Sequence, residues 1–176
     1  IRELIALAKA PPGDINYSTG KIGSTTHLAS ELFNSMAGVK IVSVYYNSTA
    51  MALNDLIGGQ VQMMISNAAA VVPHMKSGKL KALAVTYTKP TALAPGLPPV
   101  SDILPNYEAV TILGIFAPAA TPPAIVNRLS QEMGRALNKA EVKDKLFNIG
   151  ADAVGGPPEQ LMSEVKKEIS KWGKVI

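Results

Sequence analysis

Apolar residues along the first half of the chain switch between two spacings. From Thr26 onward, Leu28, Leu32 and Phe33 recur at the helical period, and Gly38 stands where a helix would end. The next run, 41–44, is mostly apolar, as in a buried strand. Since this order of strand, polar loop and helix repeats twice more with short links, the pattern predicts a parallel sheet of right-handed βαβ units.

The same reasoning assigns the remaining elements. Helices are predicted over 2–10, 49–57, 68–75, 122–137, 140–148 and from 157 to the last residues, and strands over 15–17, 61–65, 79–86 and 109–116. Thr121 is the expected cap of the helix that begins at Pro122 and Pro123. Between residues 87 and 106 the chain is rich in proline, which predicts a connection between two parts of the protein.

The composition favours helices packed on a sheet, because apolar residues make up 47% of the chain and aromatic residues only 5%. The net charge of +4 is scattered and forms no stripe, so nucleic-acid binding has little electrostatic support.

No apolar run reaches the roughly 18 residues of a membrane span. The absence of cysteine excludes disulfides, thiolate zinc sites and a cysteine nucleophile. The chain starts inside a helical pattern without Met, which indicates a truncated or processed start.

Three polar loops follow successive predicted strands, over 18–25, 46–49 and 66–67. Ligands of open parallel sheets bind in such loops, at the carboxyl ends of the strands. The loops carry hydroxyls, amides and glycines, and none carries Asp or Glu. This pattern offers hydrogen-bond donors without a carboxylate that would repel an anion.

The first loop gives the strongest indication of binding. Gly20 and Gly23 allow the backbone to approach a ligand closely, while Ser24, Thr25 and Thr26 occupy the start of a helix. Unpaired main-chain amides beside 23–25 and the positive end of the helix dipole would attract a small anion there. Alternatively, these residues are ordinary helix caps, which is the better reading for any single Ser or Thr.

Residues for catalysis or for a nucleotide are sparse. Lys21 precedes Gly23, which is the wrong order for a phosphate-binding P-loop, and no G-x-G-x-x-G motif is present. His27 and His74 are far apart and lack metal-ligand spacing. Asp55 and Asp102 stand singly rather than as an acid–base pair, and no nucleophile elbow occurs. The sequence therefore predicts binding without catalysis, and no catalytic residue, cofactor or metal.

Several blocks, in this order, resemble the Bug-type solute receptors of tripartite tricarboxylate transporters. The most specific block runs through Ile15-Asn16-Tyr17-Ser18-Thr19-Gly20-Lys21-Ile22-Gly23-Ser24-Thr25-Thr26-His27-Leu28-Ala29. Further matches lie at 31–33, 56–61, 73–80, 82–86, 114–119 and 121–122. The likeness extends over essentially the whole chain.

The resemblance implies a periplasmic receptor without catalytic activity. Its fold is an α/β periplasmic-binding-protein type II (Venus flytrap) fold, present here as a truncated chain. Residues 1–107 would form the second ligand-binding lobe, and 108–176 would return to the first lobe, whose N-terminal half is absent. A small carboxylate would be the ligand and membrane transporter subunits the partners. Residue by residue, the implied ligand-binding positions are Ser18, Thr19, Gly23, Ser24, Thr25, Ser66 and Asn67.

This chain departs from the family pattern at four positions near the implied site. The family usually has a small residue at Lys21, Pro at Tyr45 and Gly at Ser48, and many members have Asp at Ser66. Lys21 and Ser66 are therefore candidates for tuning the ligand preference.

Two other functions fit the same loops. An effector-binding domain of a transcription regulator can share this two-lobed fold, although no helix-turn-helix segment is found here. A phosphate-handling enzyme would need an acid, base or metal set at the strand ends.

The strand over 109–116 would lack its neighbours, because the N-terminal half of the first lobe is absent. We therefore expect another copy of the chain or a further segment to cover it, which makes a homo-oligomer possible.

Overall fold

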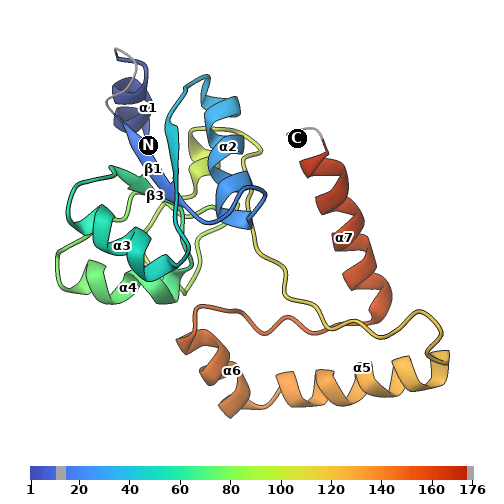
Figure 1. Cartoon of the computed structure of the whole chain (residues 1–176). Coiled ribbons are helices and arrows are strands. Elements are labelled where there is room, and N and C mark those ends of the chain that lie inside the picture. The colour runs from blue at the N-terminus through green and yellow to red at the C-terminus, as the bar shows by residue number, and fades with distance from the viewer. Residues whose placement is uncertain (11–14, 174–176) are drawn as a thin grey trace. The chain divides into compact units, whose positions relative to one another are not determined.

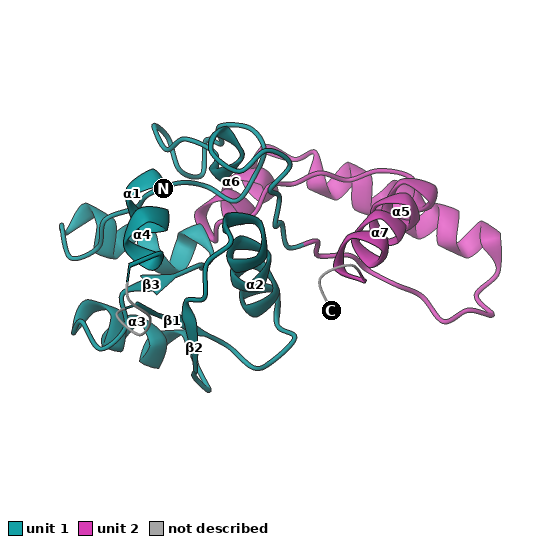
Figure 2. Cartoon of the chain, turned by 90° about the horizontal axis from the view of Figure 1, so that it is seen from above, with its two compact units in different colours: residues 1–111, 175 teal, residues 112–174, 176 magenta. Residues whose placement is uncertain are grey.

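The computed structural model describes residues 1–10 and 15–173 (Figure 1). The chain divides into two compact units, one of residues 1–111 and one that begins at residue 112 (Figure 2). The first unit contains a β-sheet, whereas the second consists of helices and extended segments in its described residues.

The first unit is a parallel sheet whose strands alternate with helices. Its elements in order are α1 (Arg2–Ala8), β1 (Asn16–Thr19), α2 (Thr25–Ala37), β2 (Val42–Tyr45), α3 (Thr49–Ile57), β3 (Met63–Met64), α4 (Ala68–Lys76) and the 3-10 turn η1 (Val100–Asp102). The strand order is β2-β1-β3, and Ser18 of β1 lies opposite Val44 on one side and Met64 on the other. The prediction of an α/β fold with parallel βαβ units is confirmed.

The central strand β1 is covered on both faces, because α2 and α3 lie on opposite sides of it (Figures 1 and 2). The hydroxyl of Tyr17 donates to Glu31 Oε1 at 2.6 Å, and Thr19 Oγ1 lies 3.1 Å from Thr26 Oγ1. Tyr17 and Thr19 therefore face α2. Since side chains alternate along a strand, Ser18 faces the opposite side. All three side chains are buried.

Helix α2 ends as its sequence predicts and is tied to the next strand. Gly38 adopts the left-handed conformation, with φ of 63°, at the C-terminus of the helix. One turn earlier, the buried side chain of Asn34 bonds both main-chain groups of Ile41: Nδ2 donates to the carbonyl at 3.1 Å, and Oδ1 accepts from the amide at 3.3 Å. This pair of bonds fixes where the chain turns toward β2.

The core of the first unit is completed by residues that follow the proline-rich stretch. Tyr107 is fully buried, its hydroxyl donates to the carbonyl of Ala29 at 2.9 Å, and its ring meets Phe33 edge-on at 6.3 Å between centroids. Burial raises the pKa of Tyr107 above the ordinary tyrosine value. Residues up to 107 thus pack against α2 within the same unit.

Two predicted strands of the first unit differ in the structure. The strand expected over 61–65 is reduced to β3, and the one expected over 79–86 is absent apart from a single bridge between Val85 and Pro99. Val85 donates to Pro98 O and accepts from the amide of Val100, both at 2.9 Å. Because Pro98 and Pro99 have no N–H, the proline-rich segment cannot extend this bridge into a ladder.

In its described residues the second unit has three helices, α5 (Pro123–Leu137), α6 (Ala140–Asn148) and α7 (Pro158–Trp172), and α5 packs against the other two. The helix over 140–148 is confirmed, as is the proline at the start of α5. The cap predicted at Thr121 is wrong, because Pro122 is the N-cap and no side chain bonds the first amides. Instead, the Thr121 amide closes a turn with Pro118 O at 2.9 Å.

The strand predicted over 109–116 is also wrong. Ala109 donates to Thr86 O at 3.0 Å, but 110–117 join no ladder with any described residue. The physical reason is that a strand needs a neighbouring backbone, and this unit offers only helices and extended segments. Leu113 and Ile115 are consequently 84% and 73% exposed.

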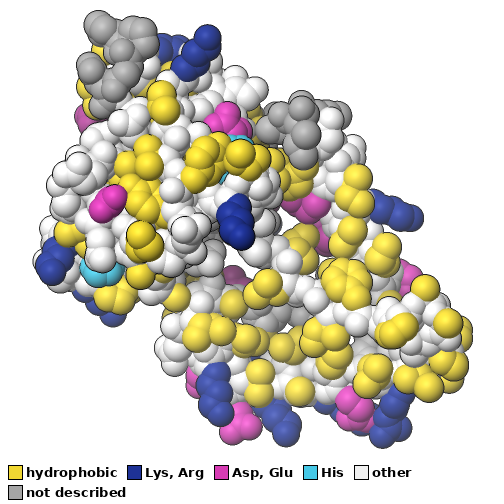
Figure 3. Space-filling model, in the orientation of Figure 1, with side chains coloured by type: hydrophobic (Ala, Val, Ile, Leu, Met, Phe, Trp, Pro, Cys, Tyr) yellow, Lys and Arg dark blue, Asp and Glu magenta, His cyan; other side chains and the backbone are white. Residues whose placement is uncertain are grey.

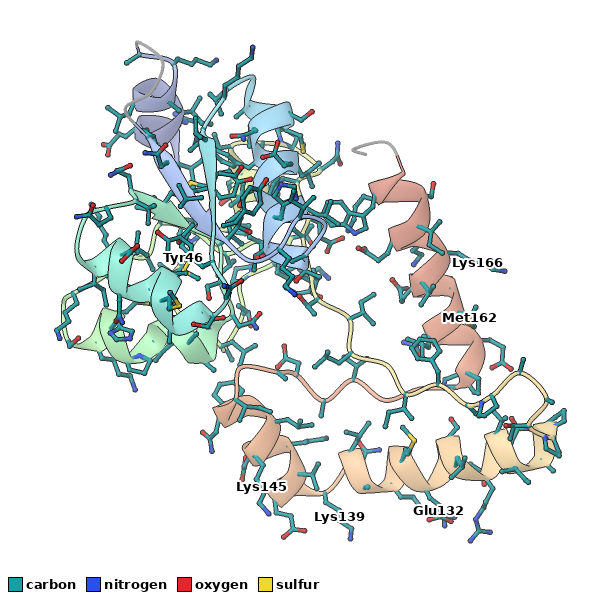
Figure 4. The ribbon with its side chains drawn as sticks, in the orientation of Figure 1. Tyr46, Glu132, Lys139, Lys145, Met162 and Lys166 are labelled. Carbon is teal, nitrogen blue, oxygen red and sulfur yellow. The ribbon has the colours of Figure 1, made fainter. Side chains whose placement is uncertain are left out.

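The second unit keeps a wide apolar surface. None of its described residues is buried, and aliphatic side chains spread over α5, α7 and the segment before α5 (Figure 3). Charged side chains gather along the opposite edge, where Glu132, Lys139 and Lys145 project (Figure 4). Within the described residues, no helix has both the length and the apolar character that a membrane crossing demands.

Candidate functional site

The three polar loops singled out in the sequence lie at one edge of the sheet. The strands β1, β2 and β3 are parallel, so their carboxyl ends, at Thr19, Tyr45 and Met64, share that edge. The loop after β1 is joined to the loop after β2, because the amide of Tyr46 donates to Thr19 O at 2.9 Å. The arrangement matches the place where open parallel sheets bind ligands.

The loop after β1 is shaped by a left-handed glycine and a capping serine. Gly23 has φ of 78°, a conformation that disfavours any side chain. Ser24 is the N-cap of α2, and its Oγ accepts from the amide of His27 at 3.3 Å. Thr26 Oγ1 lies 3.2 Å from Ser24 Oγ and 3.1 Å from Thr19 Oγ1. The hydroxyls therefore hold the helix start to the end of β1, as ordinary caps do.

The prediction that the amides of 23–25 are all unpaired is only partly correct. The Gly23 amide donates to His27 Nδ1 at 3.3 Å, and the Ser24 amide donates to Lys21 O at 2.9 Å. The first bond was not predicted from the residue pattern, because it depends on the imidazole of His27, four residues later. The amides of Thr25 and Thr26 bond no acceptor within the described part of the chain, so the free donors are that of Thr25, as predicted, and that of Thr26, one residue further into α2.

Two of the predicted binding side chains are inaccessible. Ser18 is fully buried within β1, and its Oγ has no hydrogen-bond partner among the described residues. Thr19 is 1% exposed and is engaged with Thr26. Thr25 is exposed and Ser24 half-buried. Only the latter two hydroxyls in this loop reach the surface.

Ser66 and Asn67 lie at the same edge but apart from the first loop. Asn67 is the N-cap residue of α4, and its side chain makes no capping bond. Its carbonyl accepts from the amide of Ala70 at 3.1 Å. Ser66 is half-buried and Asn67 exposed, and no hydrogen bond joins either to 18–25 in the described structure.

A set of three side chains beside the loop was not predicted from the sequence. His27 Nε2 lies 3.3 Å from the hydroxyl of Tyr45, and Ser43 Oγ donates to the same hydroxyl at 3.0 Å. The rings of His27 and Tyr45 are 5.7 Å apart. The alternation of a strand places residues 43 and 45 on one face, but their contact with His27 arises only when α2 packs beside β2.

The hydroxyls of two nearby tyrosines, Tyr46 and Tyr17, are already hydrogen-bonded to carboxylates. Tyr46 (labelled in Figure 4) donates to Asp55 Oδ2 at 2.7 Å. This hydrogen bond, with smaller contributions from burial and charge, raises the pKa of Tyr46. Burial, followed by the bond to Glu31, raises the pKa of Tyr17. Glu31 and Asp55 are thus paired with tyrosines and lie outside the first loop.

Two hollows of the structure lie away from the residues of the first loop. They have volumes of about 470 and 410 Å³ and are lined by other residues: the first by Glu31, Ser35, Lys40 and their neighbours, the second by residues of α5 and 154–157. Among the described residues, no group of three or more His, Asp or Glu side chains could hold a metal ion. The edge presents donors on an open surface.

Similar proteins cover this chain from end to end. The family described as "Tripartite tricarboxylate transporter family receptor" matches residues 1–176. A UPF0065 protein of the clcB-clcD intergenic region in Pseudomonas knackmussii is 38% identical, over 88% of this chain and 93% of its own length. Protein BugT of Bordetella pertussis is 32% identical, over 98% of this chain and 53% of its own.

Solved structures share the fold. R. palustris Rpa4515 with adipate is 35% identical with a TM-score of 0.87, over 99% of this chain and 59% of the other. The periplasmic binding protein BugD is 28% identical with a TM-score of 0.79, over 99% and 60%. The fold is thus the one found in these binding proteins, and the chain spans about half the length of several curated relatives that it matches. This chain belongs to the family of tripartite tricarboxylate transporter receptors.

Proposed function

We propose that this chain is part of a periplasmic receptor that binds a small carboxylate and delivers it to a tripartite tricarboxylate-type membrane transporter, without catalysing a reaction. Its membership of the receptor family supports this, as does the similarity to a protein solved with adipate. BugD, a periplasmic binding protein of the same fold, supports the compartment.

The observation that carries the proposal is the start of α2. The amides of Thr25 and Thr26 are free donors in the described structure, and they lie at the positive end of a helix of 13 residues. The hydroxyls of Ser24 and Thr25 lie beside them, and the surrounding loop contains no carboxylate. A carboxylate is the kind of ligand that such a helix start stabilises.

The residues implied by the family take different roles in this proposal. Ser24 and Thr25 contact the ligand, and Gly23 supplies the left-handed turn that exposes the helix start. Ser18 and Thr19 support the loop from within the sheet, because their side chains are buried in β1. Ser66 and Asn67 remain proposed contacts from the loop after β3.

The proposed lobe arrangement assigns 1–107 to the second ligand-binding lobe and 108–176 to the first. Further polypeptide, either another copy of this chain or a segment beyond these residues, would cover the exposed side chains of 109–116. We expect the isolated chain to self-associate in light scattering because Leu113, Ile115 and Phe116 are 84%, 73% and 66% exposed. A strictly monomeric, well-folded species with the 18.5 kDa mass of this sequence would contradict the expectation.

Replacing Thr25 by Glu tests the binding site directly. A carboxylate at the first position of α2 repels an anionic ligand, yet it stabilises the helix by about 0.3–1 kcal/mol through the dipole. We therefore expect Thr25→Glu to fold with equal or higher thermal stability while its affinity for adipate falls at least about tenfold. NMR titration of the isotope-labelled chain measures the affinity, and thermal unfolding measures the stability.

Thr25→Gln is the matched control, because glutamine has the same size without the charge. It keeps the main-chain amide and loses only the hydroxyl, so it should bind adipate more tightly than Thr25→Glu does. Unchanged adipate binding by Thr25→Glu would exclude the start of α2 as the carboxylate site. The family assignment would then stand without this site.

A further inference from the structure

The hydroxyl of Tyr45 stands beside the proposed site in an unusual hydrogen-bonding state. It lies at the carboxyl end of β2, its side chain is 47% exposed, and it contacts His27 in the first turn of α2. Only one side chain therefore separates this phenol from the helix start. Its neighbour Tyr46 is different, because that hydroxyl donates to Asp55.

The direction of each hydrogen bond around His27 follows from the Gly23 amide. A main-chain N–H can only donate, so His27 Nδ1, 3.3 Å away, must be the acceptor. The neutral ring then carries its proton on Nε2, and that nitrogen donates to the Tyr45 oxygen. Ser43 Oγ donates to the same oxygen at 3.0 Å.

The phenol oxygen of Tyr45 therefore accepts two hydrogen bonds, and its own hydroxyl proton is not used in either of them. No described residue accepts a hydrogen bond from the Tyr45 hydroxyl. Donors to a hydroxyl oxygen polarise its O–H bond and make it a stronger donor in turn. The exposed proton is thus best matched by a charged oxygen acceptor supplied from outside the chain.

We propose that Tyr45 is a specificity-determining residue that donates its hydroxyl proton to a carboxylate oxygen of the ligand held at the start of α2. This inference rests on the proposed function. His27 acts as the positioning residue, since its ring joins the Gly23 amide to Tyr45 and fixes the orientation of the phenol. Ser43 adds the second donor that leaves the phenol proton free.

The test compares two adjacent tyrosines. Tyr45→Phe keeps the ring but removes the donor, and we expect its affinity for adipate to fall about tenfold, the effect of one hydrogen bond to a charged group. Tyr46→Phe is the matched control, because its hydroxyl is already paired with Asp55, and it should bind adipate as the unsubstituted chain does. NMR titration gives the affinities.

A spectroscopic readout separates a direct donor from a residue that merely supports the loop. Adipate should perturb the ultraviolet absorption of tyrosine in the unsubstituted chain and in Tyr46→Phe, because the Tyr45 phenol gains an acceptor. The perturbation should vanish in Tyr45→Phe.

The outcomes separate this inference from the proposed function. Equal adipate affinity in Tyr45→Phe and the unsubstituted chain, or an absorption change that persists in Tyr45→Phe, would overturn the role of Tyr45 alone. If neither adipate nor another dicarboxylate bound the unsubstituted chain at tens of millimolar, the proposed function would fail and the role of Tyr45 with it.

Discussion

Replacing Tyr107 by Ala is expected to lower the free energy of unfolding of the first unit by about 4 kcal/mol, the usual cost of removing a buried aromatic ring. Tyr107 is fully buried, meets Phe33 edge-on and donates to the carbonyl of Ala29. The substitution removes the ring and leaves a cavity beside α2. Urea unfolding monitored by amide hydrogen exchange in α2 and β1 measures the loss.

Two further variants show which part of the side chain matters. Tyr107→Phe keeps the ring and loses one hydrogen bond, so it should cost about 1 kcal/mol. Tyr87→Ala, at a tyrosine that is 43% exposed, should cost less than about 0.5 kcal/mol. A loss below about 1 kcal/mol for Tyr107→Ala would show that the segment up to residue 107 does not complete this core.

The pH dependence of unfolding offers an independent check. Burial raises the pKa of Tyr107, so the folded unit keeps this proton at a pH where the unfolded chain loses it. The contribution of the Tyr107 hydroxyl to the free energy of unfolding is fully present below the ordinary tyrosine pKa of about 10. It is lost as the pH rises above that value. Tyr107→Phe should therefore weaken the alkaline loss of stability.

Elements whose burial is local to the first unit could be predicted from the sequence. Helix α2 follows from the spacing of Leu32 and Phe33 and from Gly38, and the structure places its C-cap at that glycine. The conformation of 109–116 could not be predicted correctly. An apolar run indicates only that a segment is stabilised by packing against another one, and it does not show whether such a segment is present. Leu113 and Ile115 carry the pattern of a buried strand, but no described segment forms a strand beside them.

The position of the loop after β1 at the carboxyl edge of the sheet could be predicted from the sequence, but which of its amides are free could not. Glycines and hydroxyls placed the candidate site at the carboxyl edge of the sheet, since that inference needs only the order of strands and loops. Which amides are free depends on side-chain contacts between elements. The bond from Gly23 to His27 and the link from His27 to Tyr45 arise when α2 packs beside β2, and the spacing of residues does not encode that geometry.

The isolated chain is expected to bind adipate weakly, with a dissociation constant in the millimolar range. Two charge-assisted bonds, from the amides of Thr25 and Thr26, contribute together about 3–6 kcal/mol, and the tenfold effect of the proposed Tyr45 bond adds about 1.4 kcal/mol. Ordering the ligand reduces that sum, while millimolar binding requires about 4 kcal/mol and micromolar binding about 8. The amides of Gly23 and Ser24 cannot add to it, because His27 and Lys21 already accept from them.

Titrating the labelled chain with adipate measures this constant through the amide shifts of Thr25 and Thr26. The matched ligand is 1,6-hexanediol, which has the same carbon chain and no charge, and it should leave these shifts unchanged at equal concentration. A micromolar constant for the isolated chain would mean that one sheet edge holds the ligand alone. Millimolar binding would instead indicate that most of the affinity of a complete receptor comes from donors outside this chain, since it spans 59% of the adipate-bound neighbour.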